Sequence, residues 1–330
     1  MLSKAVLIAF TVVPMISSFF SIMGSSTILV MISKSRKKFS DPYRRLIFGI
    51  SFYDLIQSIT FIFKIFRTTP EQPNAWIALG NQTSCSVLGW MHFAGLNGTL
   101  LYNVALNIYY LCLVRFNMTA RKYKNRVEPF LHAIPNLWAI ISASTLAGTG
   151  HLNPAYAGEC LIAPYPINCL KKNDVECIRG ENTDLYRLLF RVIPTFVAFF
   201  VCVFTLGLLW WTVESQEKRM NQYRMSMVSL RLRTSINNEL GPGPRRLQKT
   251  MSSVRSLFKG NSDTDVTKNN PKYRRRRHQG RVFLAQARWY VLAFLLTHVC
   301  PIVVVSAEWG GNKPPIWVLM VAKVLVPLQG

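Results

Sequence analysis

The feature that most constrains this chain is a set of long apolar stretches without charge. Ala5–Ile32 and Val87–Val114 each run for 28 residues without a single Lys, Arg, Asp or Glu. A helix rises 1.5 Å per residue, so about 20 such residues cross the roughly 30 Å hydrocarbon core of a bilayer. Val87–Val114 lacks the apolar–polar alternation of a membrane β-barrel strand. The sequence therefore predicts membrane-spanning helices and argues against a soluble domain.

Seven long, mainly apolar stretches predict an all-α membrane protein, a seven-transmembrane helix bundle. The expected spans are Ala5–Ile32, Leu46–Ile65, Val87–Val114, Phe130–Gly150, Val192–Trp211, Trp289–Ala307 and Pro314–Gly330. The last stretch has 17 residues, about 25 Å of helix, so we expect a truncated seventh helix and a slightly longer protein. On this basis the chain divides into spans one to five with short loops (1–212), a long basic cytoplasmic loop (213–288) and spans six and seven (289–330).

Positive charge is distributed unevenly between the predicted loops. The chain has 39 Lys and Arg against 15 Asp and Glu, a net charge of +24. Loop 5–6 alone holds 18 basic and 5 acidic residues, whereas loop 4–5 holds five of each sign. Because cytoplasmic loops are rich in Lys and Arg, we expect an extracellular N-terminus. We expect a multi-pass protein of the plasma membrane.

The long basic loop is expected to be helical at its start and partly disordered after it. Residues 214–233 are good helix formers, and residues 245–281 are polar, basic and rich in serine. The run Arg274–Arg277 lies in a loop tethered to the membrane. We therefore expect contact with anionic inner-leaflet lipid rather than with nucleic acid.

Four of the seven cysteines fall on the predicted outer face, a pattern typical of an oxidising compartment. They are Cys85, Cys160, Cys169 and Cys177. Four cysteines allow three pairings, and some of them could be free. We expect Cys85 to pair with one of the three cysteines of loop 4–5, and the remaining two to pair within that loop. Asn81 begins an N-glycosylation sequon on the same face.

Seven helices, an outer N-terminus and a cysteine at the outer end of span three opposite loop 4–5 cysteines resemble a G protein-coupled receptor. Ser51–Leu55, Tyr109–Phe116 and Pro327–Gly330 resemble the cyclic-AMP-receptor-like branch of unicellular eukaryotes. The rhodopsin-like Asp/Glu-Arg-Tyr motif is not found at the inner end of span three. The resemblance implies that an unknown extracellular ligand signals to a heterotrimeric G protein, whose contacts would include Arg115, Arg121 and Arg281.

Asp54 is the only acidic residue deep within a predicted span, where a charge costs at least about 2.5–3.5 kcal/mol. The resemblance implies a hydroxyl partner fourteen residues after Cys85, which is Thr99, with Ser25 as a third member. The functional interpretation is an intramembrane polar site for a sodium ion or a proton. A neutral, hydrogen-bonded structural Asp54 is the alternative.

Candidates for a ligand pocket lie near the outer ends of the last three spans or within span seven. They are Arg191, His298, Lys323 and Trp317. Arg187 and Arg191 lie one turn apart and could receive an anionic ligand group. We favour the alternative, in which they pair with Glu181 or Asp184 or lie in the head-group zone. A buried lysine forms a Schiff base with retinal, but animal opsins place it about where Pro327 stands, four residues after Lys323.

No metal-ligand cluster, paired carboxylates, Gly-rich phosphate loop or nucleophile–base pair is visible in the sequence. We therefore expect no enzyme, and no metal or cofactor apart from the sodium ion near Asp54. A seven-span transporter or channel stays open as an alternative, although such proteins usually have internal repeats and several polar residues at the midplane. Here no repeat is visible, and charge inside the bundle is nearly confined to Asp54 and Lys323. A retinal photoreceptor is the third alternative.

Overall fold

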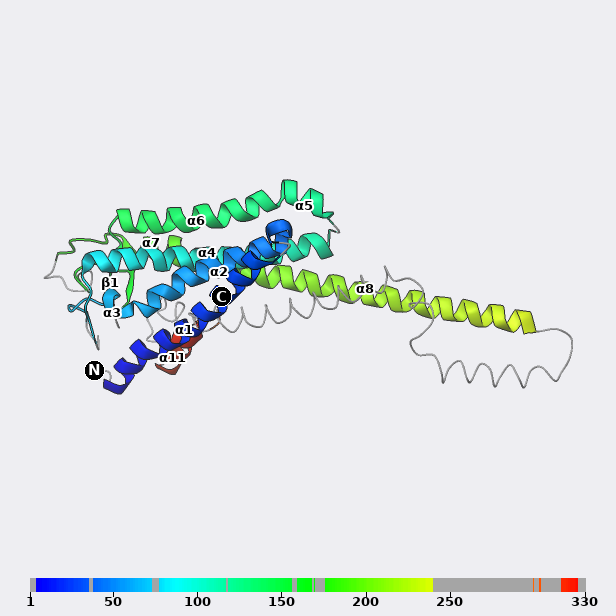
Figure 1. The fold of residues 1–330 in the computed structure, drawn as a ribbon, viewed down its shortest axis with the longest axis horizontal. Helices are drawn as coiled ribbons and strands as arrows, with labels where there is room; N and C mark the ends of the chain where they lie inside the picture. The colour runs from blue at the N-terminus through cyan, green and yellow to red at the C-terminus, as the bar shows by residue number, and fades with distance from the viewer. Residues whose placement is uncertain are drawn as a thin grey trace. The chain divides into compact units, whose positions relative to one another are not determined.

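The computed structural model is built almost entirely from helices (Figure 1). It describes residues 4–35, 38–72, 77–116, 118–155, 159–167, 169, 176–239, 299, 303 and 316–325. In chain order the elements are α1 (Lys4–Lys34), η1 (Lys38–Ser40), α2 (Pro42–Ile62), α3 (Lys64–Arg67), α4 (Gln82–Val114), α5 (Ala120–Arg126), α6 (Glu128–Gly148), β1 (Leu152–Pro154), β2 (Cys160–Ile162), α7 (Thr183–Arg187), the π-helical turn η4 (Leu188–Val192), α8 (Ile193–Glu239) and α11 (Ile316–Leu325).

The helices coincide with most of the expected spans. Four segments are long and apolar enough to cross a membrane, namely Lys4–Lys34, Pro42–Ile62, Glu128–Gly148 and Thr183–Thr212. They correspond to spans one, two, four and five, and α4 contains the third. Span two ends at Ile62 rather than near Ile65, because Phe63 leaves the helical conformation before α3 begins. The expected sixth span lies outside the described residues apart from Val299 and Val303, and α11 lies within the seventh.

The folded chain divides into two compact units. One contains Met1–Leu208 with Leu292–Gly330, and the other contains Leu209–Val291. The described part of the second unit is the continuation of α8 through Glu239, which includes the expected helical extension of span five. The rest of the long basic loop lies outside the described residues.

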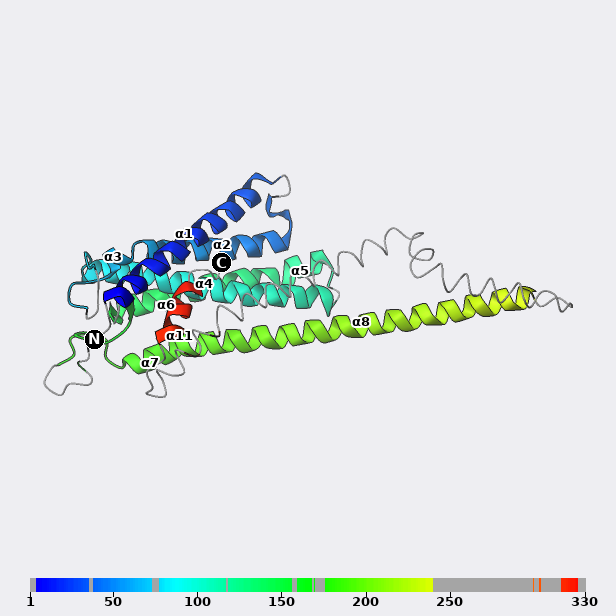
Figure 2. The ribbon, with the colours of Figure 1, turned by 90° about the horizontal axis from the view of Figure 1, so that it is seen from below.

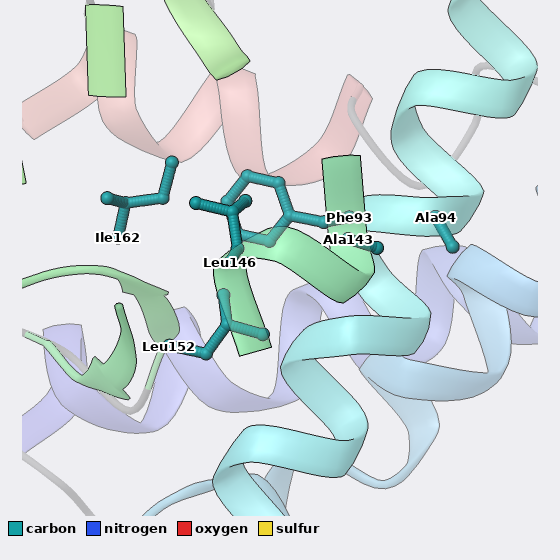
Figure 3. Close-up of a cluster of buried hydrophobic side chains, with 6 residues drawn as sticks. All are labelled: Phe93, Ala94, Ala143, Leu146, Leu152 and Ile162. Atoms are coloured by element: carbon teal, nitrogen blue, oxygen red, sulfur yellow. The ribbon is translucent and has the colours of Figure 1, made fainter. Parts of the chain in front are cut away.

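Within the first unit, α4 is the central helix. It packs against α2 on one side and α6 on the other; α1 packs against α2, and α11 packs against α1. Figure 2 shows α2, α4 and α6 running alongside one another from a second direction. Antiparallel strands β1 and β2, with Leu152 opposite Ile162, form a hairpin against α4. The core beneath this hairpin consists of Phe93, Ala94, Ala143, Leu146, Leu152 and Ile162 (Figure 3).

The helices expose many large apolar side chains and bury several polar ones, unlike the helices of a soluble bundle. On α1 the buried positions include Ser18, Ser21 and Ser25, whereas Phe19 and Phe20 are more than half exposed. On α6 the exposed stripe recurs every three or four residues and comprises Phe130, Ile134, Leu137 and Ile141. Such stripes are stable where the surrounding medium is hydrocarbon, because lipid chains solvate them as well as a protein core does.

Gly98 allows α4 to approach α2 closely. A Cβ at this position would lie 2.2 Å from a ring carbon of Tyr53, and this ring is held by a 2.7 Å hydrogen bond from its hydroxyl to Asn136 Oδ1. We expect Gly98→Ala to lower the free energy of unfolding by about 1–3 kcal/mol through overpacking.

The matched control is Gly24→Ala on α1, where an added Cβ meets nothing within 4 Å. Alanine is the better helix former, so this variant should be unchanged or slightly more stable. Thermal unfolding of the detergent-solubilised chain measures both variants. Equal midpoints for the two would contradict the close approach of α2 and α4.

Candidate functional site

Two serines of α1 hold the carboxylate of Asp54 near the middle of α2. Asp54 Oδ2 accepts hydrogen bonds from Ser21 Oγ at 2.7 Å and from Ser25 Oγ at 2.5 Å. Asp54 is 1% exposed. Ser21 lies four residues before Ser25, so both hydroxyls lie on one face of α1. This site therefore ties α1 to α2 inside the apolar part of the bundle.

The other expected partner, Thr99, lies on α4 and is also buried. Its hydroxyl has no hydrogen-bond partner among the described residues, so the structure brings Ser25 to Asp54 but forms no such bond from Thr99. Ser21 was missed by the sequence reasoning. The signal was its spacing, because a residue one helical turn from Ser25 shares its face.

A second polar network joins α2, α4 and α6. Tyr53 donates to Asn136 Oδ1, and Asn136 Nδ2 donates to the Tyr102 hydroxyl at 2.8 Å. The Tyr102 hydroxyl also lies 3.1 Å from His132 Nδ1. Hydrocarbon offers no hydrogen-bond partner to a polar group, so in the apolar interior these side chains satisfy one another. Sequence reasoning missed this network because its members lie on three separate helices.

A partly buried ion pair connects α2 to α6 at the end of the bundle that carries α5. Arg45 donates to Glu128 through Nε and Nη2, and the distance from Nη2 to Glu128 Oε2 is 2.7 Å. The side chain of Arg45 is 21% exposed and that of Glu128 is 6% exposed. Tyr123 of α5 is buried nearby. Burial raises the pKa of the Tyr123 hydroxyl above its usual value, and the negative charge of Glu128 raises it further.

The residues expected to face a G protein are partly described. Arg115 follows α4, Arg121 lies on α5, and both are exposed at the same end of the bundle as the Arg45–Glu128 pair. Arg281 lies outside the described residues. Basic side chains are therefore accessible at this end of the bundle.

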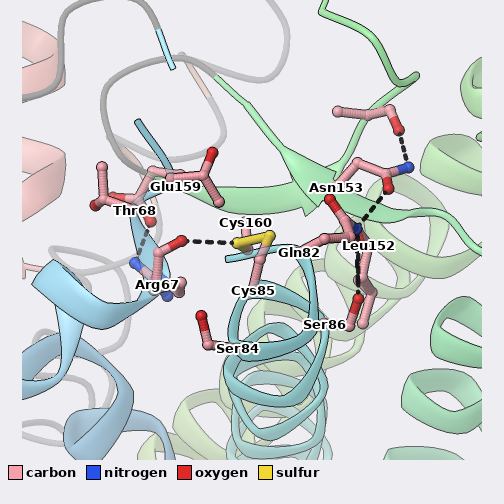
Figure 4. The surroundings of a disulfide bond; sticks show 12 residues. Arg67, Thr68, Gln82, Ser84, Cys85, Ser86, Leu152, Asn153, Glu159 and Cys160 are labelled. Carbon is pink, nitrogen blue, oxygen red and sulfur yellow. Dashed lines mark hydrogen bonds and ion pairs between the residues drawn. A yellow bond between two sulfur atoms is a disulfide. The ribbon is translucent and has the colours of Figure 1, made fainter. Parts of the chain in front are cut away.

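The opposite end of the bundle carries two disulfides, which confirms the expectation of disulfide bonding. Cys85 of α4 pairs with Cys160 of β2 (Figure 4). Cys169 pairs with Cys177. Of the three pairings left open by the sequence, the structure selects the one in which Cys85 takes the first cysteine of loop 4–5. Asn81 of the sequon is exposed, and its side chain caps α4 by accepting from Ser84 N at 2.8 Å.

The ligand-pocket candidates are not brought together within the described part of the chain. Arg187 lies 3.7 Å from Asp184 and donates to the Ile162 carbonyl at 3.2 Å, in line with pairing. Trp317 is 68% exposed. Arg191 lies in η4, half-buried. Lys323 lies on α11, but its side chain and the whole of His298 are outside the described residues.

One expectation is wrong. Charge inside the bundle is not nearly confined to Asp54 and Lys323, because Lys64 and Arg67 of α3 are almost completely buried, with Glu159 beside them. Lys64 Nζ lies 3.2 Å from Glu159 Oε1, and Arg67 Nη2 bonds Glu159 Oε2. The helix break at Phe63 produces this arrangement, because it turns α3 so that its cations face inward.

Comparison with known proteins finds no matching family model and no matching characterised protein. Among solved structures, the crystal structure of squid rhodopsin is similar, with a TM-score of 0.53 and 12% sequence identity. The match covers 99% of this chain and 81% of the squid protein. At this identity the likeness concerns the fold alone. The chain is a multi-pass membrane protein with the helical, seven-transmembrane-type fold found in squid rhodopsin.

Proposed function

We propose that this protein is a G protein-coupled receptor that passes a signal from an extracellular ligand to cytoplasmic heterotrimeric G proteins. The observation that carries the proposal is the likeness to squid rhodopsin over 99% of the chain. In this assignment the disulfide end faces outward, the N-terminus is extracellular, and the membrane is the plasma membrane. The motif strings of the sequence support placement near the cyclic-AMP-receptor-like branch.

The polar core supplies a means of transmission. Asp54 ties α1 to α2, the Tyr53–Asn136–Tyr102 chain ties α2 to α4 and α6, and Arg45–Glu128 ties α2 to α6 at the inner end. A ligand shifts such a bundle only if it binds one helix arrangement better than the other. Each hydrogen bond between helices is either made or broken, so these bonds give the helix bundle discrete arrangements.

The inner face is the proposed docking surface for the G protein. Arg115 and Arg121 are exposed there, and Arg281 of the long loop joins them in the proposal. Basic residues of the same loop are proposed to contact anionic inner-leaflet lipid. Nucleotide exchange on co-expressed G proteins, measured with and without residues 213–288, tests the coupling. Equal exchange under all stimuli would count against a receptor.

Asp54 is the proposed cation-sensitive element of the bundle. A carboxylate beside two hydroxyls offers the oxygen ligands that a sodium ion takes. We expect sodium, compared with choline at equal ionic strength, to lower basal nucleotide exchange in the native chain. Asp54→Asn should abolish this sodium response and change basal exchange about 5-fold or more, the usual scale of coupling between sites.

The control for this experiment is Asp184→Asn, which removes a carboxylate that is 80% exposed at the disulfide end. Its sodium response should match that of the native chain. A sodium response that survives in Asp54→Asn would place the effect elsewhere and leave Asp54 as a structural residue.

A retinal photoreceptor is a second candidate, favoured by one observation. Lys323 lies on α11, the helix that packs against α1. Retinal added to the purified chain should then produce a visible absorbance band that Lys323→Ala removes. Absence of any band in the native chain would dismiss this function without affecting the receptor proposal.

A further inference from the structure

The short helix α3 presents its side chains in an unexpected way. Its cations, Lys64 and Arg67, are 1% and 0% exposed, whereas Phe66 and the preceding residue Phe63 are close to half exposed. Basic residues near a helix end usually extend toward head groups and water. Here the phenyl rings occupy the outer face and the cations point inward, so head-group contact does not explain them.

Arg67 has more hydrogen-bonding capacity than the surrounding residues fill. Its Nη2 bonds Glu159. Its Nε and Nη1 are buried and have no hydrogen-bond partner in the part of the chain that the structure describes. A buried donor on a charged group that lacks an acceptor is destabilising. The guanidinium therefore has a strong tendency to take a further acceptor.

The guanidinium is also held rigidly. It lies 5.2 Å from the centre of the Phe61 ring, in a cation–π contact. Its partner residue, Glu159, directly precedes Cys160, which the disulfide fixes to α4. The Glu159 carbonyl accepts a 2.8 Å hydrogen bond from Gln72 Nε2. Figure 4 shows Arg67, Glu159 and the disulfide together at this end of the bundle.

Gly80, in the segment before α4, contacts the backbone of α3 and of the residue that follows it. Its amide donates to the Thr68 carbonyl at 2.8 Å, and a Cβ at this position would lie 2.2 Å from the Phe66 carbonyl oxygen. The segment that leads into α4 therefore packs directly on α3. Groups fixed in this way lose little entropy when a ligand binds, which favours affinity.

We propose that Arg67 is the anchor of an anion-binding site at the disulfide end of the bundle. Its ligand is a soluble molecule with a carboxylate or phosphate group, which accepts from Nε and Nη1 while Glu159 keeps Nη2. Arginine is suited to this because its planar fork matches the oxygens of both groups. The proposal concerns binding alone and does not depend on coupling to a G protein.

The test uses the full chain purified in a phosphate-free sugar detergent. One probe is radiolabelled inorganic phosphate, whose binding is counted directly. The other is acetate, whose binding is followed through the thermal unfolding midpoint. Chloride keeps the ionic strength constant in both measurements. We expect phosphate, acetate or both to bind saturably, with one anion bound per chain. The responding probe identifies the chemical group.

Arg67→Gln should weaken binding about 10- to 100-fold, the range expected for loss of hydrogen bonds from a charged group. The matched control is Arg187→Gln, which removes another arginine from the same end whose side chain is 38% exposed. It should bind as the native chain does. If Arg67→Gln does not fold, Arg67→Lys replaces it, since lysine keeps the charge but loses the fork.

Three results would overturn the proposal. They are no saturable binding of either probe to the native chain, equal binding by the native and Arg67 variants, and equal weakening in the Arg187 control. A comparison of phosphatidylcholine and phosphatidic acid nanodiscs tests the source of the anion. Loss of phosphate binding only in phosphatidic acid would assign the site to a lipid head group and overturn the soluble ligand.

Discussion

Replacing Cys85 with serine is expected to remove most folded protein from the cell surface. The Cys85–Cys160 bond spans 75 residues of sequence, and closing a loop of that size contributes about 4.5 kcal/mol in the chain-entropy model. It also fixes the hairpin to α4, so its loss frees Glu159 from its position beside Arg67. Surface expression of a tagged chain, with the unfolding midpoint of any protein recovered, measures the effect.

The second disulfide provides the comparison. Cys169–Cys177 closes a span of only 8 residues, for which the same model gives about 2.5 kcal/mol. Cys169→Ser should therefore retain clearly more folded protein than Cys85→Ser. The reverse order would mean that the short loop, and not the link between hairpin and α4, holds this end of the bundle together.

Glu128→Ala is expected to have the next largest effect on stability. The side chain of Glu128 is 6% exposed and that of Arg45 is 21% exposed, so removing the carboxylate leaves a mostly buried cation without its partner. Breaking a buried pair in this way typically costs about 3–5 kcal/mol. The cost here should lie near the lower end of that range, because Arg45 retains some contact with water. Thermal unfolding of the purified chain is the measurement.

Glu214→Ala is the matched control for this prediction. Glu214 pairs with Lys218 at 2.9 Å, but both side chains are largely exposed, at 47% and 73%. Exposed pairs of this kind contribute about 0.2–1 kcal/mol. If the two variants were destabilised equally, burial would not be what makes the Arg45–Glu128 pair strong.

The sequence predicted the spans well because the requirement behind them is local. A helix in lipid satisfies its backbone within itself and needs about 20 apolar residues in a row. Such a run is visible without knowledge of any neighbour, as in Val87–Val114. The ends of the spans were predicted less accurately. The second span ends at Ile62, because Phe63 departs from helical geometry in a run that is still apolar.

The polar contacts were predicted only where one residue was conspicuous alone. Asp54 could be identified because a carboxylate in a span is costly, and Ser25 was linked to it correctly. Thr99 was linked to it through family resemblance, and its hydroxyl makes no bond to Asp54 in the structure. The Tyr53–Asn136 bond joins residues 83 positions apart, and nothing in either local sequence indicates the other.

The amino-acid sequence alone indicates a helical membrane bundle, the positions of its first five spans, and the segments that carry the oxidisable cysteines. These properties follow from transfer free energy and charge, which each segment expresses independently. Packing in the folded bundle, by contrast, pairs Cys85 with Cys160, places two serines beside Asp54, and turns the cations of α3 inward. Those outcomes depend on which helix faces lie opposite one another, and that is a property of the whole packed bundle.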